Sequence, residues 1–248
     1  MNSNFSDQLR ILSERVRVIL VAPKYEGNIG AVARSMRNSG LSDLAIVNPP
    51  YIGDEAMARA MGGREILDSR RTYQTLEEAA SGFSVIVATS SVATLNRKKF
   101  RRIPVSPDEF WQEFSMRNDR IAIVFGREDD GLRNEEIEFC NYFINIPGSP
   151  EYPVYNLSHA AAIILYEMIK HIPDNVDSDY KEPISPENYS LLMERIGELL
   201  DMVSFPKSRR RNIDTMIRRI TARSSLTQTE YFKIMGIIRI LIKHLESY

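Results

Sequence analysis

Short apolar runs rich in β-branched residues alternate with segments of helical periodicity through the first 170 residues of the chain. Runs that are apolar at every position are typical of strands covered on both faces of a parallel sheet. Five strands are predicted, at 16–22, 44–48, 85–90, 121–126 and 142–147. Helices are predicted at 28–39, 54–61, 75–81, 107–115, 133–140 and 156–171. The alternation predicts an α/β domain with a mostly parallel sheet, in which ligands bind at the carboxyl ends of the strands.

A purely helical region follows an acidic, proline-flanked stretch of the chain. Residues 172–185 have no apolar periodicity and are predicted to be a linker. They separate a predicted domain at 1–171 from a predicted extension at 186–248. In the extension, Thr227 and Glu230 have the spacing of a capping box at the start of a helix. The chain is therefore expected to combine an α/β domain with a small all-helical C-terminal extension.

The composition is that of a globular protein with a full core. The chain has 248 residues, of which 43% are hydrophobic and 26% are charged, and its formal net charge is -1. Because Cys140 is the only cysteine, an intramolecular disulfide and a cysteine-based metal cluster are excluded, and a secreted protein is not expected. The N-terminus is polar and no apolar run has the length of a membrane span, which predicts a cytoplasmic protein.

The first candidate for chemistry is the loop-to-helix segment at 23–40. Gly27 and Gly30 let the backbone approach a ligand closely, and free N–H groups at a helix start favour anions. Arg34 and Arg37 lie three residues apart on one helical face, which suits a phosphodiester backbone. The segment has neither a Walker loop nor a dinucleotide fingerprint. Taken alone, it is more simply explained as a solvated arginine pair on an amphipathic helix.

Two further segments have a strand that runs into a loop with candidate functional residues. In one, Gly126 permits a planar ligand to pack against the strand end, and Glu128 is placed to orient a neighbouring loop. In the other, residues 144–168, a strand runs into a proline-rich loop and then into a helix capped near Asn156 or Ser158. An acidic turn and an ordinary helix start explain these segments, each taken alone, at least as well as function does.

Together, in this order and spacing, the three segments resemble the signature motifs of the SpoU–TrmD (SPOUT) methyltransferases. The first family element, N-x-G-x-x-A-R, corresponds here to Asn28, Gly30, Ala33 and Arg34. The second, F-G-x-E-x-x-G-L, corresponds to Phe125, Gly126, Glu128, Gly131 and Leu132. The third, N-[LIV]-S, corresponds to Asn156, Leu157 and Ser158. The stretch 150–152 and the segment 218–230 are similar to features of the TrmJ group, the tRNA 2′-O-methyltransferases that act on nucleotide 32 of the anticodon loop. The resemblance covers nearly the whole chain.

The resemblance implies a C-terminal trefoil knot in the α/β domain, a homodimer, and S-adenosylmethionine bound in the knot. It implies 2′-O-methylation of a tRNA ribose, on cytidine, with uridine left open. It assigns catalytic roles to Asn28, Arg34 and Glu128. The residues that correspond to the cofactor loops are Thr89, Ser90, Ser91, Gly126, Ile146, Pro153, Val154, Tyr155 and Leu157. Relatives usually have serine where this chain has Val154, so no side-chain hydrogen bond is expected from that position.

Basic residues are the candidates for binding RNA phosphates. Because a guanidinium is effectively always protonated, we hypothesise that Arg34 grips a phosphate and favours the developing alkoxide, and that it does not accept the proton. Clusters at 96–102 and 207–212 add local positive charge to a near-neutral chain. The expected RNA-binding residues are Arg37, Arg97, Lys98, Lys99, Arg209, Arg210, Arg211 and Arg218. The expected partner is tRNA, and neither DNA, a membrane nor a metal is expected.

Other functions stay open at this point. A ribosomal RNA methyltransferase of the same superfamily is the nearest alternative, and a non-catalytic RNA-binding or assembly protein is the alternative from another class. A nicotinamide dehydrogenase is disfavoured because the glycine fingerprint is absent. His159 is interpreted as a capping or packing residue more readily than as a base. Cys140 and Trp111 are expected in the core.

Overall fold

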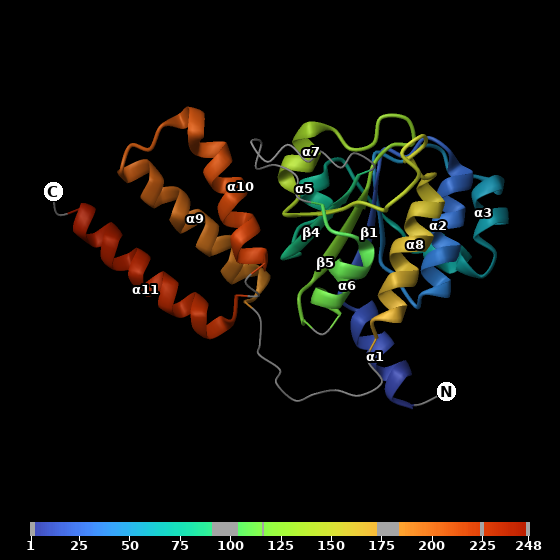
Figure 1. The fold of residues 1–248 in the computed structure, drawn as a ribbon, viewed down its shortest axis with the longest axis horizontal. Helices are drawn as coiled ribbons and strands as arrows, with labels where there is room; N and C mark the ends of the chain where they lie inside the picture. The colour runs from blue at the N-terminus through green and yellow to red at the C-terminus, as the bar shows by residue number, and fades with distance from the viewer. Residues whose placement is uncertain (1–2, 91–103, 116, 173–183, 224–225, 247–248) are drawn as a thin grey trace. The chain divides into compact units, whose positions relative to one another are not determined.

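The computed structural model describes residues 3–90, 104–115, 117–172, 184–223 and 226–246 (Figure 1). Contacts divide the chain into two compact units, one built on a β-sheet and one on the C-terminal helices. Each unit has its own buried core. Most of the predicted linker at 172–185 lies outside the described residues, so the predicted domain boundaries stay predictions.

The first unit is an α/β fold with a six-stranded, all-parallel sheet in the order β3-β2-β1-β5-β4-β6. Five strands lie where the apolar runs predict them, which confirms the fold class. The pattern does not predict β3, because its three residues are partly exposed and form no apolar run. The strands are β1 (Val16–Val21), β2 (Leu44–Val47), β3 (Arg71–Tyr73), β4 (Val85–Thr89), β5 (Ile121–Phe125) and β6 (Tyr142–Ile144).

The six predicted helices of this unit are confirmed, with ends that differ by no more than two residues. Two α-helices, α1 and α4, and one 3-10 helix, η1, are not predicted by the apolar periodicity. The helical segments are α1 (Ser3–Ser13), α2 (Glu26–Asn38), α3 (Asp54–Ala60), η1 (Met61–Gly63), α4 (Arg64–Asp68), α5 (Leu76–Ala79), α6 (Pro107–Phe114), α7 (Asn134–Phe139) and α8 (Leu157–Lys170).

In β1, β2 and β5, alternate side chains point to opposite faces of the sheet and are buried on both. One face packs against α5 and α7 through Leu76 and Ile137, and Cys140 lies in this layer. Complete burial raises the pKa of the Cys140 thiol, so this cysteine is inert. Helices α2, α6 and α8 pack together, and Trp111 of α6 is fully buried. The predictions for Cys140 and Trp111 are confirmed.

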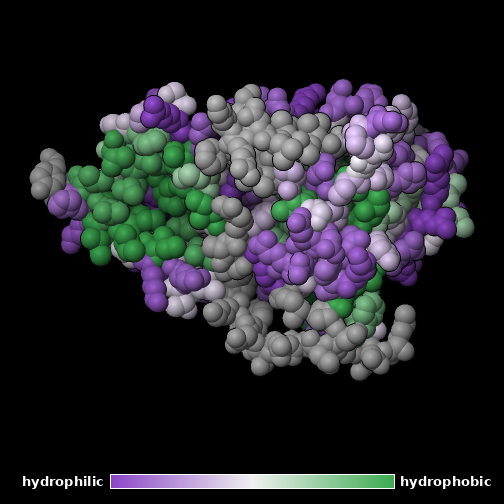
Figure 2. Space-filling view, viewed as in Figure 1, coloured by the Kyte–Doolittle hydropathy of each residue, from purple (hydrophilic) through white to green (hydrophobic). Residues whose placement is uncertain are grey.

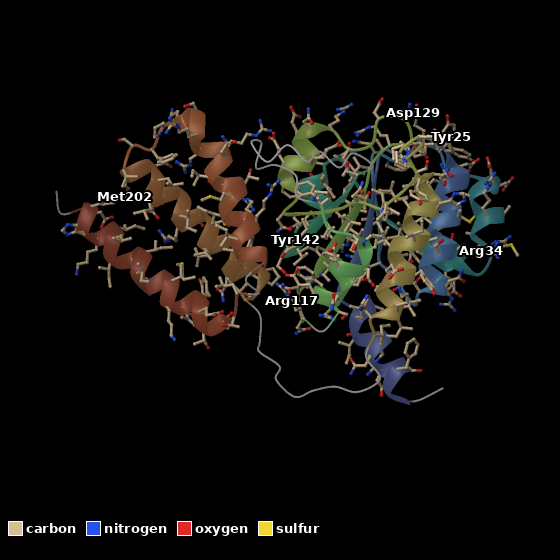
Figure 3. All side chains as sticks on the ribbon, viewed as in Figure 1. Tyr25, Arg34, Arg117, Asp129, Tyr142 and Met202 are labelled. Carbon is tan, nitrogen blue, oxygen red and sulfur yellow. The ribbon has the colours of Figure 1, made fainter. Side chains whose placement is uncertain are left out.

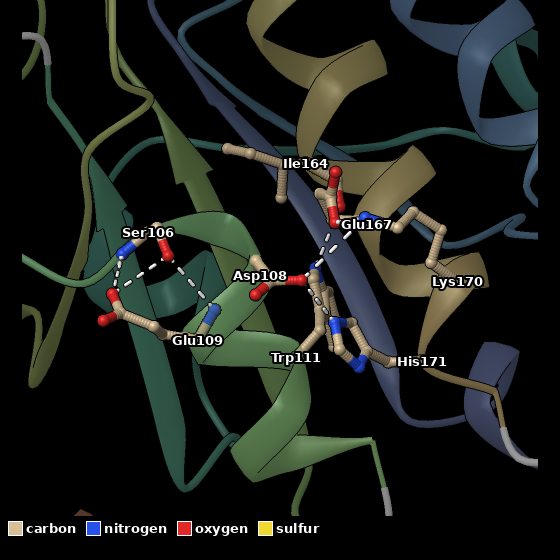
Figure 4. A network of polar contacts seen from close by, with 8 residues as sticks. All are labelled: Ser106, Asp108, Glu109, Trp111, Ile164, Glu167, Lys170 and His171. Atoms are coloured by element: carbon tan, nitrogen blue, oxygen red, sulfur yellow. Dashed lines mark hydrogen bonds and ion pairs between the residues drawn. The ribbon is translucent and has the colours of Figure 1, made fainter.

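Polar contacts tie the start of α6 to the end of α8 (Figure 4). The indole Nε1 of Trp111 donates to the carbonyl of Ile164 at 2.9 Å. At the protein surface, a carboxylate oxygen of Asp108 lies 2.9 Å from Nε2 of His171, which follows the last turn of α8. These contacts fix the C-terminal half of α8, whose N-terminal end lies at the candidate site described below.

The second unit contains α9 (Pro186–Met202), α10 (Lys207–Arg223) and α11 (Gln228–Leu245). The predicted capping box is confirmed, because Thr227 Oγ1 accepts from the N–H of Glu230 at 3.3 Å and the Glu230 carboxylate accepts from the N–H of Thr227 at 2.9 Å. The buried core consists of Ile184, Tyr189, Leu192, Leu226, Tyr231, Met235 and Ile238. Many other apolar side chains of this unit stay exposed (Figure 2).

No helix in the described part of the chain is long and apolar enough to cross a membrane. The trefoil knot that the sequence resemblance implies stays a prediction.

Candidate active site

A cavity of about 420 Å³ opens where β4, β5 and β6 end. These three strands are neighbours in the parallel sheet, so the loops that follow them meet at one edge. The loop before α8 and the first turn of that helix complete the wall. The volume is typical of small-molecule sites, which measure roughly 300–1,000 Å³. The cavity therefore lies where a parallel sheet is expected to bind a ligand.

Eight of the nine residues predicted to bind the cofactor line this cavity, and Ser91 lies outside the described residues. The eight are Thr89, Ser90, Gly126, Ile146, Pro153, Val154, Tyr155 and Leu157. The hydroxyl of Tyr155 donates to the carbonyl of Pro147 at 3.1 Å, so the loop before α8 is closed on itself. Val154 contributes an apolar side chain that is 47% exposed.

Glu128 lines the cavity and holds the segment that begins α2. One carboxylate oxygen accepts from the amide of Asn28 at 2.9 Å and from the N–H of Tyr25 at 3.3 Å. The other accepts from the N–H of Lys24 at 2.8 Å. Lys24 and Asp129 add an ion pair between the same two loops. Four polar contacts thus fix the loop after β5, which contains Glu128 and Asp129, to the segment that begins α2.

Asn28 connects this carboxylate to the third motif. Its side-chain oxygen accepts from the amide of Asn156 at 3.1 Å. The side-chain oxygen of Asn156 caps α8, because it accepts from the N–H of Ser158 at 2.9 Å and from its hydroxyl at 2.7 Å. A continuous chain of hydrogen bonds therefore runs through Glu128, Asn28, Asn156 and Ser158, one or two residues from each of the three sequence motifs. We call these four residues the polar chain.

A half-buried ion pair fixes the loop that carries Glu128. The two guanidinium nitrogens Nη1 and Nη2 of Arg127 donate to the two carboxylate oxygens of Glu136, at 3.0 and 2.9 Å. Glu136 also accepts from the N–H of Arg133 at 2.6 Å. Burial favours a higher pKa for Glu136, but these hydrogen bonds and the guanidinium charge outweigh it, so its pKa is lowered. The hydrogen bond with Glu136 raises the pKa of Arg127.

The glycines of the motifs serve backbone packing more directly than ligand approach. A Cβ added at Gly30 would lie 2.1 Å from the carbonyl oxygen of Ala56, so this glycine lets α3 pack on α2. A Cβ added at Gly126 would lie 2.2 Å from the carbonyl carbon of Gly131. The expectation of close ligand approach is therefore wrong for Gly30, and at Gly126 the nearest atoms belong to the loop itself, although this residue also lines the cavity.

Arg34 does not line the cavity, and it lies farther along α2 than Tyr25 at the start of the helix (Figure 3). A helix rises 1.5 Å and turns about 100° per residue, so Arg34 is about 9 Å along the axis from Asn28 and about 120° around it. Among the described residues, no hydrogen-bond or ion-pair partner reaches its exposed guanidinium. Arg37 is also exposed. Within this chain, Arg34 is therefore separated from the polar chain.

Comparison with known families identifies the group to which this arrangement belongs. The model of the SpoU rRNA Methylase family matches residues 15–166, which is more than half of the chain. The chain belongs to the SpoU rRNA methylase family. The matched span contains all of the sheet, the cavity and the polar chain.

Members of the SpoU family that resemble this chain include curated proteins of similar length. The tRNA (cytidine-2′-O-)-methyltransferase TrmJ of Methanocaldococcus jannaschii is 38% identical over 225 residues, which cover 89% of this chain and 97% of that protein. The tRNA (cytidine/uridine/adenosine-2′-O-)-methyltransferase TrmJ of Pseudomonas aeruginosa is 34% identical over 91% of this chain and 93% of its own. A crystal structure of TrmJ from Z. mobilis matches with a TM-score of 0.71 and 27% identity, over 91% and 98% of the two chains.

The structure describes only some of the basic residues that are predicted to bind RNA. Arg97, Lys98 and Lys99 lie outside the described residues. In the extension, Arg209 and Arg211 are exposed, and Arg218 is half-buried. Arg210 forms an ion pair with Asp201 and donates to the carbonyl of Gly197 at 2.7 Å, so it ties α10 to α9.

Two other groups of side chains carry atoms that could act in catalysis or bind a metal ion. His159 is exposed on the first turn of α8. Among the described residues, only Asp108, Glu167 and His171 bring three possible metal-ligand atoms together. Lys170 lies 2.7 Å from Glu167 and 3.9 Å from Asp108, so a protein cation already compensates these carboxylates.

The sequence does not predict the residues that hold Glu128 and its loop in place, because none of them is a defining residue of a family motif. Lys24, Tyr25, Arg127 and Glu136 were not singled out, although they position Glu128 or its loop. An Arg and a Glu nine residues apart give no recognisable spacing, because the loop between them, and not a helix, brings them together.

Proposed function

We propose that this chain is an S-adenosylmethionine-dependent tRNA methyltransferase that modifies a ribose 2′-hydroxyl, with nucleotide 32 of the anticodon loop as the target. The observation that carries the proposal is the polar chain, which joins three separate segments and includes Glu128, a residue that lines the cavity. Relatives named as tRNA 2′-O-methyltransferases match through both units of the chain, which supports tRNA over ribosomal RNA.

The cavity fits S-adenosylmethionine in size and chemistry. Residues of the loops at 126–132, 144–146 and 153–157 line it, and Leu132, Ile144 and Leu157 give it apolar walls suited to an adenine ring. The acidic loop at 128–130 keeps a net negative charge after Lys24 pairs with Asp129, which suits a positively charged ligand. The cofactor supplies an electrophilic methyl group, so the protein's task is to position and activate the ribose hydroxyl.

Arg34 acts on the RNA and not as a base. Its guanidinium stays protonated, so it grips a phosphate beside the target ribose and favours the developing alkoxide, while a phosphate oxygen or water takes the proton. The polar chain fixes the start of α2, the helix on which Arg34 stands. Arg37, one turn farther, binds the neighbouring backbone.

The active unit is a homodimer in which Arg34 serves the cavity of the partner. Within one protomer Arg34 lies about 9 Å along α2 from Asn28 and on another side of the helix. A second copy whose α2 packs beside the cavity supplies the missing cation. The extension, with exposed Arg209 and Arg211, adds tRNA affinity.

Three measurements test the proposed function. Mapping 2′-O-methyl groups in tRNA and ribosomal RNA incubated with the protein and cofactor is expected to show one modified position in the anticodon loop of tRNA. Modification of ribosomal RNA alone contradicts the tRNA assignment. If titration calorimetry detects no cofactor binding, the enzyme assignment is contradicted and a non-catalytic RNA-binding protein is favoured. Arg34→Lys is expected to lose most activity, and near-normal activity contradicts a bidentate guanidinium role.

The shared site has a sharper test. Arg34→Ala and Asn28→Asp are each expected to inactivate a homodimer. A heterodimer of the two variants contains one site in which both residues are native, if Arg34 acts across the interface. It is then expected to regain about half of the wild-type activity per dimer. An inactive heterodimer places Arg34 and Asn28 of one protomer in the same site.

A further inference from the structure

Two tyrosines beside the polar chain expose their side chains to an unusual degree. Tyr25, the residue before α2, is 59% exposed, and Tyr51, in the loop that leads to α3, is 87% exposed. A single exposed aromatic residue is ordinary on a protein surface. Tyr25 and Tyr51 differ from such a residue because polar contacts or prolines fix the backbone beneath each ring.

The backbone of Tyr25 is fixed on both sides by the candidate active site. Its N–H donates to Glu128 at 3.3 Å, and its carbonyl accepts from the N–H of Asn28 at 3.0 Å. Both partners belong to the polar chain. The ring of Tyr25 therefore stands on the same backbone that aligns the first two motifs (Figure 3).

Tyr51 is held close to the same helix start. Pro49 and Pro50 precede it and restrict the backbone of its loop. A Cβ added at Gly53 would lie 2.7 Å from a ring carbon of Tyr51, so the glycine leaves room for the ring to lie against the backbone. The N–H of Gly53 in turn donates to the carboxylate of Glu26, the residue after Tyr25. Glu26 thus links the loop of Tyr51 to the backbone of Tyr25.

We propose that Tyr25 and Tyr51 form an aromatic platform on which unpaired nucleobases next to the target ribose stack. This proposal rests on the proposed function, because it assigns a binding role to residues around the same site. Single-stranded RNA loops are recognised largely by stacking of unpaired bases on aromatic side chains. Rings on a fixed backbone lose little conformational freedom when a base stacks on them. Neither tyrosine lines the cavity, so the platform serves the RNA and not the cofactor.

The experiment measures tRNA affinity, methylation and cofactor affinity for Tyr25→Ala, Tyr51→Ala and the double variant. Each single variant is expected to bind tRNA roughly tenfold more weakly, since a stacked base contributes about 1–3 kcal/mol. The double variant is expected to lose about the product of the two factors. KM for tRNA rises accordingly, while cofactor affinity is unchanged.

Salt dependence separates stacking from phosphate contact. A lost stacking contact releases no counterions, so the slope of log affinity against log salt is expected to stay at its wild-type value. Tyr25→Phe and Tyr51→Phe keep the ring and are expected to retain binding, whereas Tyr51→Leu, which is apolar without a ring, is expected to behave as Tyr51→Ala. Tyr166→Ala is the matched control, because Tyr166 is 62% exposed on α8 but ten residues beyond its capping Asn156.

Several outcomes overturn the platform. Unchanged tRNA affinity in the alanine variants, a shallower salt slope, or loss of binding in the phenylalanine variants each contradicts stacking. If the alanine variants become monomeric in analytical ultracentrifugation, the two rings contact a second copy of the chain, which contradicts a platform for RNA. A wild-type protein that neither binds nor methylates tRNA overturns the proposed function itself, whereas an active wild type with unaffected tyrosine variants overturns only the platform.

Discussion

The α/β unit and the helical unit use their polar and apolar side chains in opposite ways. In the α/β unit, both faces of the sheet are buried, and the side chains of the three motifs hydrogen-bond to one another across about 100 residues of sequence. In the described part of the helical unit the buried core has seven residues, and Phe232, Ile237 and Ile240 are each at least 60% exposed. Figure 2 shows the apolar surface of the C-terminal helices in one view.

This difference indicates a division of tasks. Chemistry requires groups held within a fraction of an ångström, which a doubly covered sheet and a continuous polar chain provide. Binding a large nucleic acid requires charge spread over a surface, and it tolerates a looser scaffold. Substitutions in the core and in the polar chain of the α/β unit are therefore expected to change the turnover rate or unfold the domain, and those in the extension to change affinity.

The largest effect is expected from Asn28→Asp. The new carboxylate faces Glu128 and can no longer donate to it, so two like charges oppose each other where the motifs meet. Turnover of tRNA is expected to fall by about a hundredfold or more, since a displacement of about 1 Å can cost that much. Asn38→Asp, at the exposed end of the same helix, is the matched control. A tRNA methylation assay with near-normal turnover of Asn28→Asp contradicts a role for the polar chain.

Packing density in the two units is compared by adding one methyl group to each. In Gly30→Ala the Cβ meets the backbone of Ala56 at 2.1 Å, so the α/β unit is expected to lose about 2–3 kcal/mol of stability. In Gly236→Ala, within α11, the Cβ meets no atom within 4 Å, and about 1 kcal/mol of stabilisation is expected. Fluorescence of the buried Trp111 follows unfolding of the first unit, and hydrogen exchange of α11 follows the second. Equal effects of the two substitutions contradict the difference in packing.

The sequence predicts the α/β unit well where a physical signal is local. Continuous apolar runs locate five strands, and the start of α8 is predicted with a cap at Asn156 or Ser158, of which the structure shows Asn156. The parallel-sheet rule places the cavity correctly, because it depends only on strand direction and order. In contrast, β3 and α4 are short and partly exposed, so neither has enough apolar positions to form a pattern.

The connections within the site could not be predicted from local patterns. Asn28 meets Glu128 and Asn156 because α2 begins beside two loops that are distant in sequence, and no spacing rule covers such a meeting. The motif resemblance identified these residues without giving their contacts. Arg34 illustrates the limit. The motif assigns it to the active centre, but only the structure shows that Arg34 does not line the cavity of this chain.

An intermediate effect is expected when the ion pair beneath Glu128 is broken. In Glu136→Gln the bidentate acceptor of Arg127 is lost, so stability at pH 7 is expected to fall by about 1–3 kcal/mol. Glu135→Gln, exposed on the same helix turn, is the control. A Glu136→Gln variant as stable as the wild type shows that the loop holds its shape without this pair.

The same pair predicts a pH dependence. The pKa of Glu136 is lower in the folded protein than its ordinary value of about 4.3, so its contribution to stability is complete above that value. The contribution is lost as the pH falls from about 4.3 through the lowered folded-state pKa. Denaturant unfolding between pH 3 and 7 is therefore expected to show a smaller acid-side loss in Glu136→Gln than in the wild type. Parallel pH profiles for the two proteins contradict the lowered pKa.

The smallest effect is expected in the extension, where two adjacent arginines differ in their contacts. Arg209 is exposed, whereas Arg210 is paired with Asp201 and bonded to the carbonyl of Gly197. If Arg209 binds a phosphate, Arg209→Ala lowers tRNA affinity a few-fold and reduces the slope of log affinity against log salt by about one. Arg210→Ala is expected to loosen the contact between α9 and α10 with little change in that slope. Titrations of tRNA binding at several salt concentrations measure both. A reduced slope in Arg210→Ala and not in Arg209→Ala would mean that tRNA displaces the ion pair, and the extension would then bind RNA by rearranging its own contacts.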